Sequence, residues 1–455
     1  MTDLSQIDTS KLNLTLSDMI KAVNQCSVKD TSEEYRFLKS ILGESGALAY
    51  YRGEDEVIQK VKDNLYQRMN EMSPMQCKCC NRELLTAHYL KQISGYGIPV
   101  HVASLKRLCE EAQQDYQNAY NNLFAKCADM GVALSEEHIH GQVELECVDE
   151  TLKMELTSVR KLWKHTLLLN FEKLVSSIRQ DVAGNYRIFC TFESFAAVSG
   201  RIQSHKPNIQ GFPKNVRVEC FQAPKGRALI YADYISEELS ILAVLAKDKQ
   251  LLADIRNGVD FHTRVASKLF CKTIEEVITL ERNCAKRLTF ACLYGAGEAT
   301  LKNMAKEILG DGSELIVKNI KKTIEEEYPA IKAIEQKIRA EGKLTFIDGS
   351  CISLESIEKK YTAVNRCIQG SGSIILKQVI IDLMDRLPSD AKIVCLIHDE
   401  VIVECSIDKL QECQAIISDV MKHVLQNFNI NIELPIEMEV RKEDKNEFSK
   451  FEKFN

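Results

Sequence analysis

Two aspartates, each placed next to a short apolar run, are the residues best suited to chemistry in this sequence. Asp399 lies in "CLIHDEVIVE", where "AKIVCLI" and "VIVEC" predict two strands joined through His398 and Asp399, without Gly, Asn or Pro at the turn. Asp233 ends "RALIYAD", which predicts a further buried strand. If these strands are neighbours, both carboxylates project from one sheet edge and can hold a pair of divalent cations for phosphoryl transfer. The alternative is that each aspartate only terminates its strand.

A third candidate element is "RNCAKRLTFACLYG", from Arg282 to Gly295. On a helix, side chains four positions apart share a face, so this stretch presents one stripe that is cationic at one end and aromatic at the other. The members of the stripe are Arg282, Lys286, Phe290 and Tyr294. The cations can neutralise a triphosphate and the rings offer surfaces for a base or a sugar. The alternative is a helix with solvated cations and aromatic residues in the core.

Composition restricts the class of protein more than its function. The 455 residues, 45% of them hydrophobic, are enough for two to four structural units with substantial cores. A net charge of -6 argues against a chain that is basic throughout, although a local basic stripe can still bind phosphates. The sequence shows no targeting segment and no uncharged apolar run of membrane-spanning length, so we expect a cytoplasmic protein, with an organelle left open.

Several stretches have the helical or irregular patterns that must position these residues. Amphipathic spacing predicts a helix around residues 57–69, and long helices at 103–128 and 148–180, with a turn-like break at 94–100 between them. Residues 200–227 form an irregular basic segment with three prolines. The motif "CKCC" at Cys77 to Cys80, with His88 nearby, lacks the second cysteine pair of a structural zinc site, which favours buried or free thiols.

The stretches "DYISEELSILAVLAKDKQLLADIRNGVDFH", "RNCAKRLTFACLYG" and "LIHDEVIVE", in this order, resemble the three polymerase motifs of family A DNA polymerases, the bacterial DNA polymerase I group. Two more segments, "SGRIQSHKPNIQGFP" and "NRCIQG", resemble the primer-template-binding segment and the template-side motif of that family. The resemblance extends from about residue 186 to the C-terminus. It implies a helix-rich, mixed α/β fold shaped like a right hand, with a palm on an antiparallel sheet, fingers and a thumb.

The resemblance assigns roles only to the residues that match these motifs. Asp233 and Asp399 become the metal-binding aspartates, for two Mg²⁺ ions that Mn²⁺ can replace, and Lys286 becomes the general acid for the leaving pyrophosphate. Residues placed at the incoming nucleotide are Arg282, Lys286, Phe290, Tyr294, His262, Glu238 and Tyr234, and those placed at primer and template are Arg201, Asn208, Gln210, Asn365, Gln369 and His398. In this family Glu238 closes the space beside the 2′ position of the sugar and so selects deoxynucleotides.

The sequence also departs from the family. Ile235, Ser236 and Glu237 stand where the first motif usually reads Ser-Gln-Ile, which adds a carboxylate beside the sugar gate and predicts altered sugar selectivity. "TFACLYG" replaces the usual Asn-Phe-Gly before the aromatic step, and Tyr361 stands where an arginine is expected. The N-terminal region offers adjacent Asp55 and Glu56 but no Asp-x-Glu pair on a first strand, so we expect no proofreading exonuclease.

The resemblance implies five segments along the chain. These are an N-terminal helical region at residues 1–93, a thumb at 94–182, a first part of the palm at 183–254, fingers at 255–363 and a second part of the palm at 364–455. The N-terminal region is a shrunken exonuclease remnant or a replacement for that domain. Basic faces at Arg160, Lys161, Lys164 and Lys173 follow the duplex backbone if this thumb assignment is correct.

The expected function is therefore template-directed DNA synthesis from a primer 3′ end. The expected partners are primer-template DNA and deoxynucleoside triphosphates. We expect a monomer that does not bind a membrane, and the sequence leaves open a processivity factor that it does not identify. A short thumb and the missing proofreading element point to gap filling, lesion bypass or replication of a small element. Two alternatives stay open: an enzyme like the single-subunit RNA polymerases, and a non-catalytic DNA-binding accessory protein.

Overall fold

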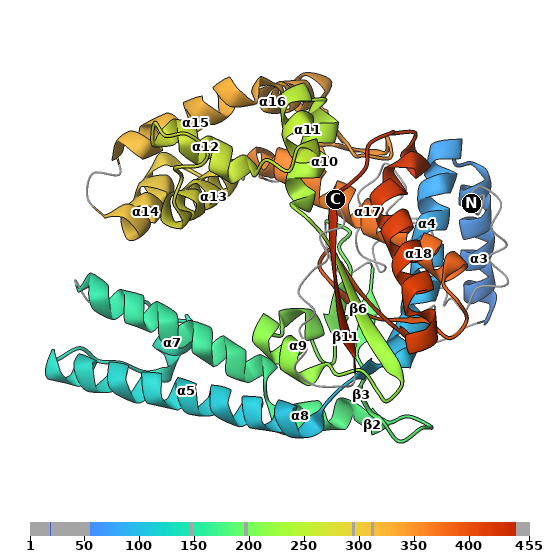
Figure 1. Cartoon of the computed structure of the whole chain (residues 1–455), viewed down its shortest axis with the longest axis horizontal. Helices are drawn as coiled ribbons and strands as arrows, with labels where there is room; N and C mark the ends of the chain where they lie inside the picture. Colours follow the sequence, from blue (N-terminus) through green and yellow to red (C-terminus); the bar gives the residue numbers. More distant parts are fainter. Residues whose placement is uncertain are drawn as a thin grey trace.

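The computed structural model describes Met19 and residues 55–145, 149–194, 199–293, 296–310, 314–357 and 359–442. Within these ranges a central antiparallel sheet lies between two groups of helices that face each other across a gap (Figure 1). We call residues 249–341 the upper lobe and residues 102–174 the lower lobe. The fold is a helix-rich mixture of α and β structure built on antiparallel sheets, which confirms the fold class predicted from the sequence.

The central sheet has four strands in the order β11-β6-β10-β9, and all neighbours are antiparallel. The strands are β6 (Arg227–Tyr234), β9 (Lys392–Ile397), β10 (Glu400–Ser406) and β11 (Ile436–Lys442). Consecutive residues of β6 and of β10 are buried, so both faces of these two strands are covered. This explains why both were readable in the sequence as continuous apolar runs rather than as alternating patterns.

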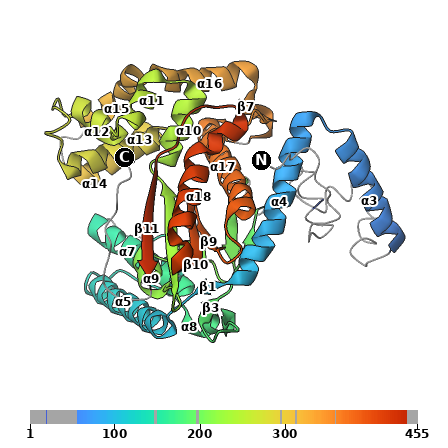
Figure 2. The ribbon, with the colours of Figure 1, turned by 45° about the vertical axis from the view of Figure 1, so that its right-hand side comes forward.

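Three long helices, α4 (Pro74–Tyr96), α17 (Ala363–Arg386) and α18 (Leu410–His423), pack beside the sheet (Figure 2). Two ion pairs with little solvent exposure join α4 to other segments: Lys377 Nζ lies 2.7 Å from Glu83 Oε2, and Arg82 contacts Asp348. Residues 360–386, which contain α17, are long and apolar enough to cross a membrane by composition. The test uses an 18-residue window of this stretch, and 83% of that window is buried inside the protein, as expected for a core helix.

The lower lobe is a pair of long helices with its own small core. Its helices are α5 (Val102–Asp129), α6 (Glu136–His140), α7 (Glu150–Leu168) and α8 (Phe171–Leu174). Leu123, Leu152 and Val159 are buried where α5 and α7 meet. The helix predicted at 103–128 is therefore confirmed, whereas the one predicted over 148–180 was too long, because the chain turns after Leu168 and forms β2 at Ile178–Gln180.

The described residues of the upper lobe form α11 (Lys249–Arg256), α12 (Phe261–Leu269), α13 (Thr279–Leu293), α14 (Glu298–Leu309), α15 (Glu314–Glu327) and α16 (Pro329–Glu341). Tyr328 is fully buried there, stacks on Phe261, and donates a hydrogen bond from its hydroxyl to Asp254 Oδ2 at 2.9 Å. The remaining elements are α3 (Asp55–Asn70), β1 (Ile98–Pro99), β3 (Tyr186–Ile188), β4 (Thr191–Glu193), β5 (Gln203–His205), α9 (Lys214–Cys220), α10 (Glu237–Ala246), β7 (Lys343–Thr345) and β8 (Cys351–Ser353).

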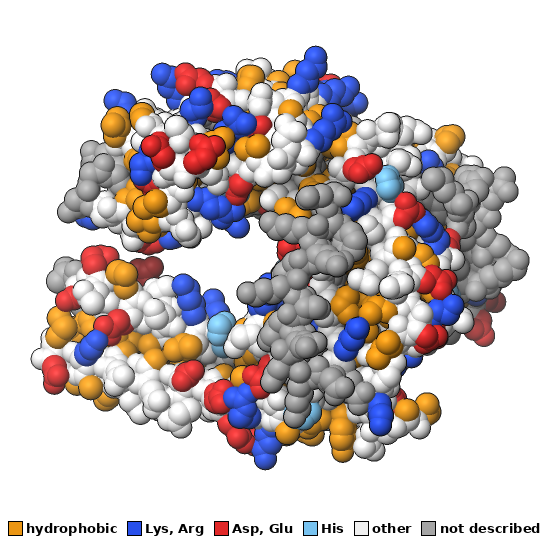
Figure 3. Space-filling model, viewed as in Figure 1, with side chains coloured by type: hydrophobic (Ala, Val, Ile, Leu, Met, Phe, Trp, Pro, Cys, Tyr) orange, Lys and Arg blue, Asp and Glu red, His pale blue; other side chains and the backbone are white. Residues whose placement is uncertain are grey.

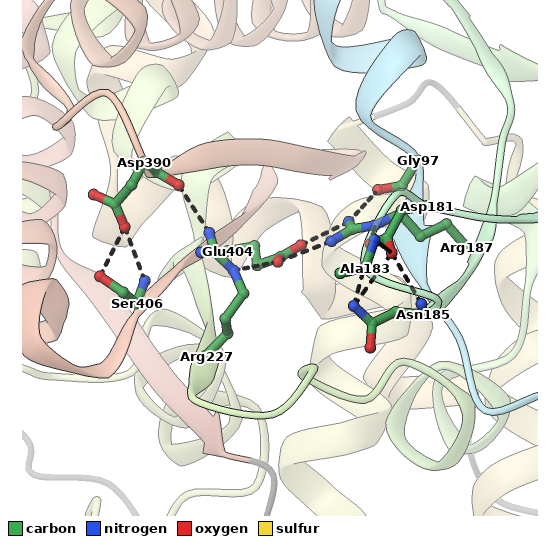
Figure 4. A network of polar contacts seen from close by, with 9 residues as sticks. All are labelled: Gly97, Asp181, Ala183, Asn185, Arg187, Arg227, Asp390, Glu404 and Ser406. Atoms are coloured by element: carbon green, nitrogen blue, oxygen red, sulfur yellow. Dashed lines mark hydrogen bonds and ion pairs between the residues drawn. The ribbon is translucent and has the colours of Figure 1, made fainter.

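A buried ionic network ties the central sheet to the small sheet formed by β1, β3 and β2 (Figure 4). Glu404, only 2% exposed, accepts hydrogen bonds from Arg187 Nη1 at 2.7 Å and Nη2 at 2.9 Å, and also from Arg227. Arg187 further donates to Asp181 and to the carbonyl oxygen of Gly97. Because Glu404 lies on β10, this network fixes the strand that carries Glu400 at its other end.

Candidate active site

The two predicted aspartates lie at the same end of the central sheet. β9 and β10 form a hairpin in which Ile397 pairs with Glu400, so His398 and Asp399 are its two turn residues. β10 also pairs with β6, and the last pair of that ladder joins Val401 to Ala232. Asp233, the next residue of β6 after Ala232, therefore lies next to the hairpin turn that carries Asp399. The structure therefore brings together the strand end with Asp233 and the turn with Asp399, as the sequence predicted.

The chain reaches these positions through strained backbone. His398 has φ +58° and Ser236, directly before α10, has φ +54°, a left-handed conformation that is uncommon for residues other than glycine. A two-residue hairpin turn needs such a conformation, so His398 replaces the glycine or asparagine that the sequence lacks. Non-glycine residues in this region carry a cost that persists where the surrounding structure enforces it, often at functional sites.

The electrostatic environment of the aspartates favours binding of cations. Burial, followed by the charges of Asp399 and Glu400, raises the pKa of Asp233 well above its usual range. Burial also raises the pKa of Asp399, although a backbone hydrogen bond and the nearby His398 and Arg201 oppose this shift. In the described part of the chain, no lysine or arginine forms an ion pair with either aspartate. A bound cation would supply the missing positive charge.

Two glutamates at the start of α10 extend this acidic region. Glu238 Oε1 lies 3.3 Å from Arg201 Nη2, so the predicted sugar gate and a predicted DNA contact are joined in this structure. Glu237 is 8% exposed. Burial, followed by the charge of Asp399, raises the pKa of Glu237 to about 8. Tyr234 is anchored behind them, where its buried hydroxyl donates to the carbonyl oxygen of Met421 at 3.0 Å.

Helix α13 presents the predicted stripe toward solvent. Cys284, Ala285, Leu288 and Thr289 are buried on one face of α13, whereas Arg282 and Phe290 are half-buried and Lys286 is exposed on the other. Tyr294, the fourth predicted member, lies outside the described residues. This stripe belongs to the upper lobe, and its cations are not among the groups that act most strongly on Asp233 and Asp399.

Asp260 organises the end of the stripe that carries Arg282. Its Oδ1 accepts hydrogen bonds from the backbone N–H groups of His262 at 2.8 Å and Thr263 at 3.2 Å, and so caps α12. Its Oδ2 accepts from Arg282 Nε at 3.0 Å and Nη2 at 2.6 Å. His262 is buried against Phe290, with ring centroids 5.1 Å apart, and burial lowers its pKa to about 4. The structure thus brings three predicted nucleotide contacts together in this lobe.

The predicted DNA contacts are spread along one side of the sheet. Gln210 Nε2 donates to the carbonyl oxygens of Ile202 and Leu396, each at 3.2 Å, so its amide holds the basic segment against β9. Asn208 caps a short turn by accepting from the N–H of Gly211 at 3.2 Å. Asn365 and Gln369 are half-buried on α17, and Asn365 Oδ1 has no hydrogen-bond partner among the described residues. An amide oxygen without a partner is suited to accept a hydrogen bond from a ligand.

The gap between the lobes has basic side chains on both sides. Figure 3 shows a hollow between the upper and lower lobes, with Lys and Arg side chains on the walls that face each other. Lys161 and Lys164 on α7 and Lys173 on α8 are exposed, as predicted. Arg160 instead donates from Nε to the carbonyl oxygen of His138 at 2.7 Å, so its guanidinium stabilises the lower lobe.

Three residues of the site received no role in the sequence analysis, namely Arg217, Glu400 and Asp260. Arg217 Nη1 lies 2.8 Å from Glu400 Oε2, beside the aspartates, and Asp260 pairs with Arg282. The position of Asp260 was detectable, because an Asp directly before a helical pattern is an N-cap signal. The pairing of Asp260 with Arg282 was not detectable, because this contact joins the start of α12 to α13.

The acidic groups fit Mg²⁺ by the chemistry of their donors. Within the described ranges, no cluster of three or more His, Cys, Asp or Glu side chains is arranged to coordinate one ion. Mg²⁺ binds through one or two carboxylates and completes its shell with waters and substrate phosphate oxygens. Asp233 and Asp399, with raised pKa values and no basic partner, match that requirement.

Comparisons with known proteins agree with this geometry. The family model for DNA polymerase family A matches residues 142–446, well over half of the chain. DNA polymerase I of Aquifex aeolicus is 32% identical over 267 residues, which cover 56% of this chain and 45% of that protein. DNA polymerase I of Bacillus subtilis is 23% identical over 418 residues, which cover 81% of this chain and 46% of that protein. The chain thus spans less than half the length of these curated relatives.

A solved structure shows the same fold. It is described as the POL domain of Pol1 from M. smegmatis in complex with DNA primer-template and dNTP, and it superposes with a TM-score of 0.73. The sequence identity is 19%, and the match covers 94% of this chain and 81% of that one. The aspartate pair and the α13 stripe agree with the family match over residues 142–446. The chain therefore belongs to DNA polymerase family A.

Proposed function

We propose that this protein is a template-directed DNA polymerase that adds deoxynucleotides to a primer 3′ end. The observation that carries the proposal is the placement of Asp233 and Asp399 at one end of the central sheet, where two half-buried carboxylates form no ion pair with a lysine or arginine of the described residues. The basic walls of the gap support a polyanionic substrate such as a primer-template duplex. In this proposal the sheet is the palm, the upper lobe the fingers and the lower lobe the thumb.

In the proposed reaction the chain's own residues bind, orient and donate a proton. Asp233 and Asp399 would hold two Mg²⁺ ions, which supply activation of the 3′-hydroxyl and neutralisation of phosphate charge when bound. Arg282 and Lys286 would bind the triphosphate, and Lys286 would protonate the departing pyrophosphate. Phe290 would support the base and sugar. The upper lobe would have to close toward the sheet to join these groups, since α13 lies in the upper lobe and the aspartates lie at the end of the central sheet.

Selection of the sugar would depend on Glu238. Its carboxylate is held by Arg201 at 3.3 Å, which orients it at the start of α10. A 2′-hydroxyl would meet this carboxylate in a space too small to admit it, so ribonucleotides are excluded by steric clash and desolvation. Glu237 adds a second acid to the same turn of helix, and we propose that sugar selectivity differs from that of relatives without it.

We further propose that the protein extends short stretches without proofreading, as in gap filling, lesion bypass or replication of a small element. No metal-binding Asp-x-Glu strand is recognisable in residues 55–145, which form helices apart from the two-residue β1. The thumb in this proposal consists mainly of α5 and α7, which offers limited contact with a duplex. The proposal takes the chain to act as a monomer, and a processivity factor would extend its products.

Primer extension tests the proposal directly. The full chain is incubated with a labelled primer-template, Mg²⁺ and either deoxynucleotides or ribonucleotides, and Asp399→Ala is the matched variant. Extension with deoxynucleotides that falls by at least about a thousandfold in Asp399→Ala is expected, because the lost carboxylate removes an electrostatic contribution to the transition state. Equal extension by both proteins would contradict the assignment of Asp399, and preferential use of ribonucleotides would favour an RNA polymerase instead.

A second primer with a mismatched 3′ nucleotide tests proofreading in the same assay. We expect the mismatched primer to persist in the absence of nucleotides. Release of its terminal nucleotide by the purified chain would contradict this part of the proposal.

A further inference from the structure

Glu237 is an acidic side chain that the roles above leave without a partner. It is 8% exposed at the first turn of α10. Among the described residues, no donor makes a hydrogen bond to its buried Oε1. An unpaired carboxylate oxygen in the interior is costly, because burial removes its water without replacing it. Such a group needs a proton or a cation nearby.

The structure accommodates this carboxylate through a glycine on α17. A Cβ atom on Gly372 would lie 2.9 Å from Glu237 Oε2 and 3.0 Å from Oε1, so any other residue at position 372 would press on the carboxylate. Gly372 lies in the middle of α17, where a glycine costs about 1 kcal/mol relative to alanine. The carboxylate is therefore seated in a space made for it between α10 and α17.

Glu237 lies four residues after Asp233, at the start of α10, the helix that directly follows β6. Of the charged groups that act on it, Asp399 has the largest effect, and Glu238 and Asp233 also oppose its ionisation. Arg201 acts in the opposite sense, but its guanidinium lies against Glu238. Asp399, Glu238 and Asp233 therefore disfavour the charged form of Glu237, and Arg201 favours it. Divalent cations held by the aspartates would reverse this imbalance.

We propose that Glu237 is a third anion of the cation site, which strengthens the binding of divalent cations by its charge without coordinating them. This inference rests on the proposed function, because the cations are those of the two aspartates. An indirect role agrees with the absence, in the described ranges, of a three-ligand cluster. The contact with Gly372 holds the carboxylate between α10 and α17.

Binding of Mn²⁺ to the DNA-free full chain tests this without activity. Free Mn²⁺ is measured by its electron paramagnetic resonance signal during titration of the wild type, Glu237→Gln and Asp399→Ala. Gln keeps the shape of the side chain and removes its charge. Asp248→Asn is the matched control. Asp248 is also buried, and its Oδ2 lacks a hydrogen-bond partner in the described structure, but Asp248 belongs to a different helix, α11, which it caps. Melting temperatures in EDTA verify that each variant is folded.

At a pH above about 8, where Glu237 is ionised, Glu237→Gln is expected to bind Mn²⁺ about tenfold more weakly than the wild type, because one elementary charge near a divalent ion is removed. Its melting temperature should rise less on addition of Mn²⁺. Asp248→Asn should match the wild type in both measurements. Unchanged Mn²⁺ affinity in Glu237→Gln, with loss of binding in Asp399→Ala, would overturn this inference alone. Unchanged affinity in Asp399→Ala as well would overturn the proposed cation site.

Discussion

Replacing Asp260 by asparagine separates two tasks that this residue performs in the upper lobe. Asn retains an oxygen that can accept from the N–H groups of His262 and Thr263, so the cap on α12 is kept. The substitution removes the charge that holds Arg282. In the proposed reaction, an incoming triphosphate would compete with Asp260 for this guanidinium and would also meet the repulsion of its carboxylate. Asp260→Asn should therefore lower the KM for nucleotide.

The size of this effect follows from the exposure of the pair. The side chains of Arg282 and Asp260 are 35% and 33% exposed, so solvent screens their attraction despite an Nη2–Oδ2 distance of 2.6 Å. Pairs of this kind contribute about 1 kcal/mol or less. One kcal/mol corresponds to a factor of about five in an equilibrium constant. We expect the KM for deoxynucleotides to fall by up to about fivefold, with kcat changed by less than about twofold.

Steady-state primer extension over a range of nucleotide concentrations measures both constants. Asp248→Asn is the control, because Asp248 also caps a helix, accepting from the N–H of Leu251 at 2.9 Å, but lies on α11. A KM that rises in Asp260→Asn, with an unchanged melting temperature, would refute the competition argument. It would show instead that Asp260 orients Arg282 for the phosphates.

Three further outcomes concern stability. Burial and Asp399 raise the pKa of Glu237 from 4.5 to about 8, so ionisation opposes folding as pH rises through that window. In EDTA, urea titrations should show Glu237→Gln gaining about 4 kcal/mol over the wild type between pH 5 and pH 9, and parallel pH profiles would contradict this. Glu404→Gln should cost about 3 kcal/mol, because two arginines lose their buried anion, and an unchanged urea midpoint would argue against the network. Gly372→Ala should be less favourable in the wild type than in Glu237→Ala by about 1 kcal/mol, and additive effects would show that the two side chains do not touch.

The sequence by itself was enough to locate the parts of the site that local patterns encode. Asp233 and the turn at His398 and Asp399 were readable because buried strands appear as apolar runs, and any polar interruption marks an end. The α13 stripe was readable because helical periodicity separates Arg282 and Phe290 from the buried Leu288. The helix predicted over residues 148–180 shows the limit of such patterns, since α7 ends at Leu168 and α8 packs against α5, which periodicity does not report.

Only the tertiary structure decided which charges face one another. The seat of Glu237 on Gly372, the pairing of Arg282 with Asp260, and the enclosure of Glu404 by two arginines each join segments from different elements. Strand ends and helix faces follow from neighbours a few positions apart, which the sequence shows directly. The partner of a buried charge follows from the packing of distant segments, because desolvation makes the energy of a charge depend on whatever group lies beside it in space.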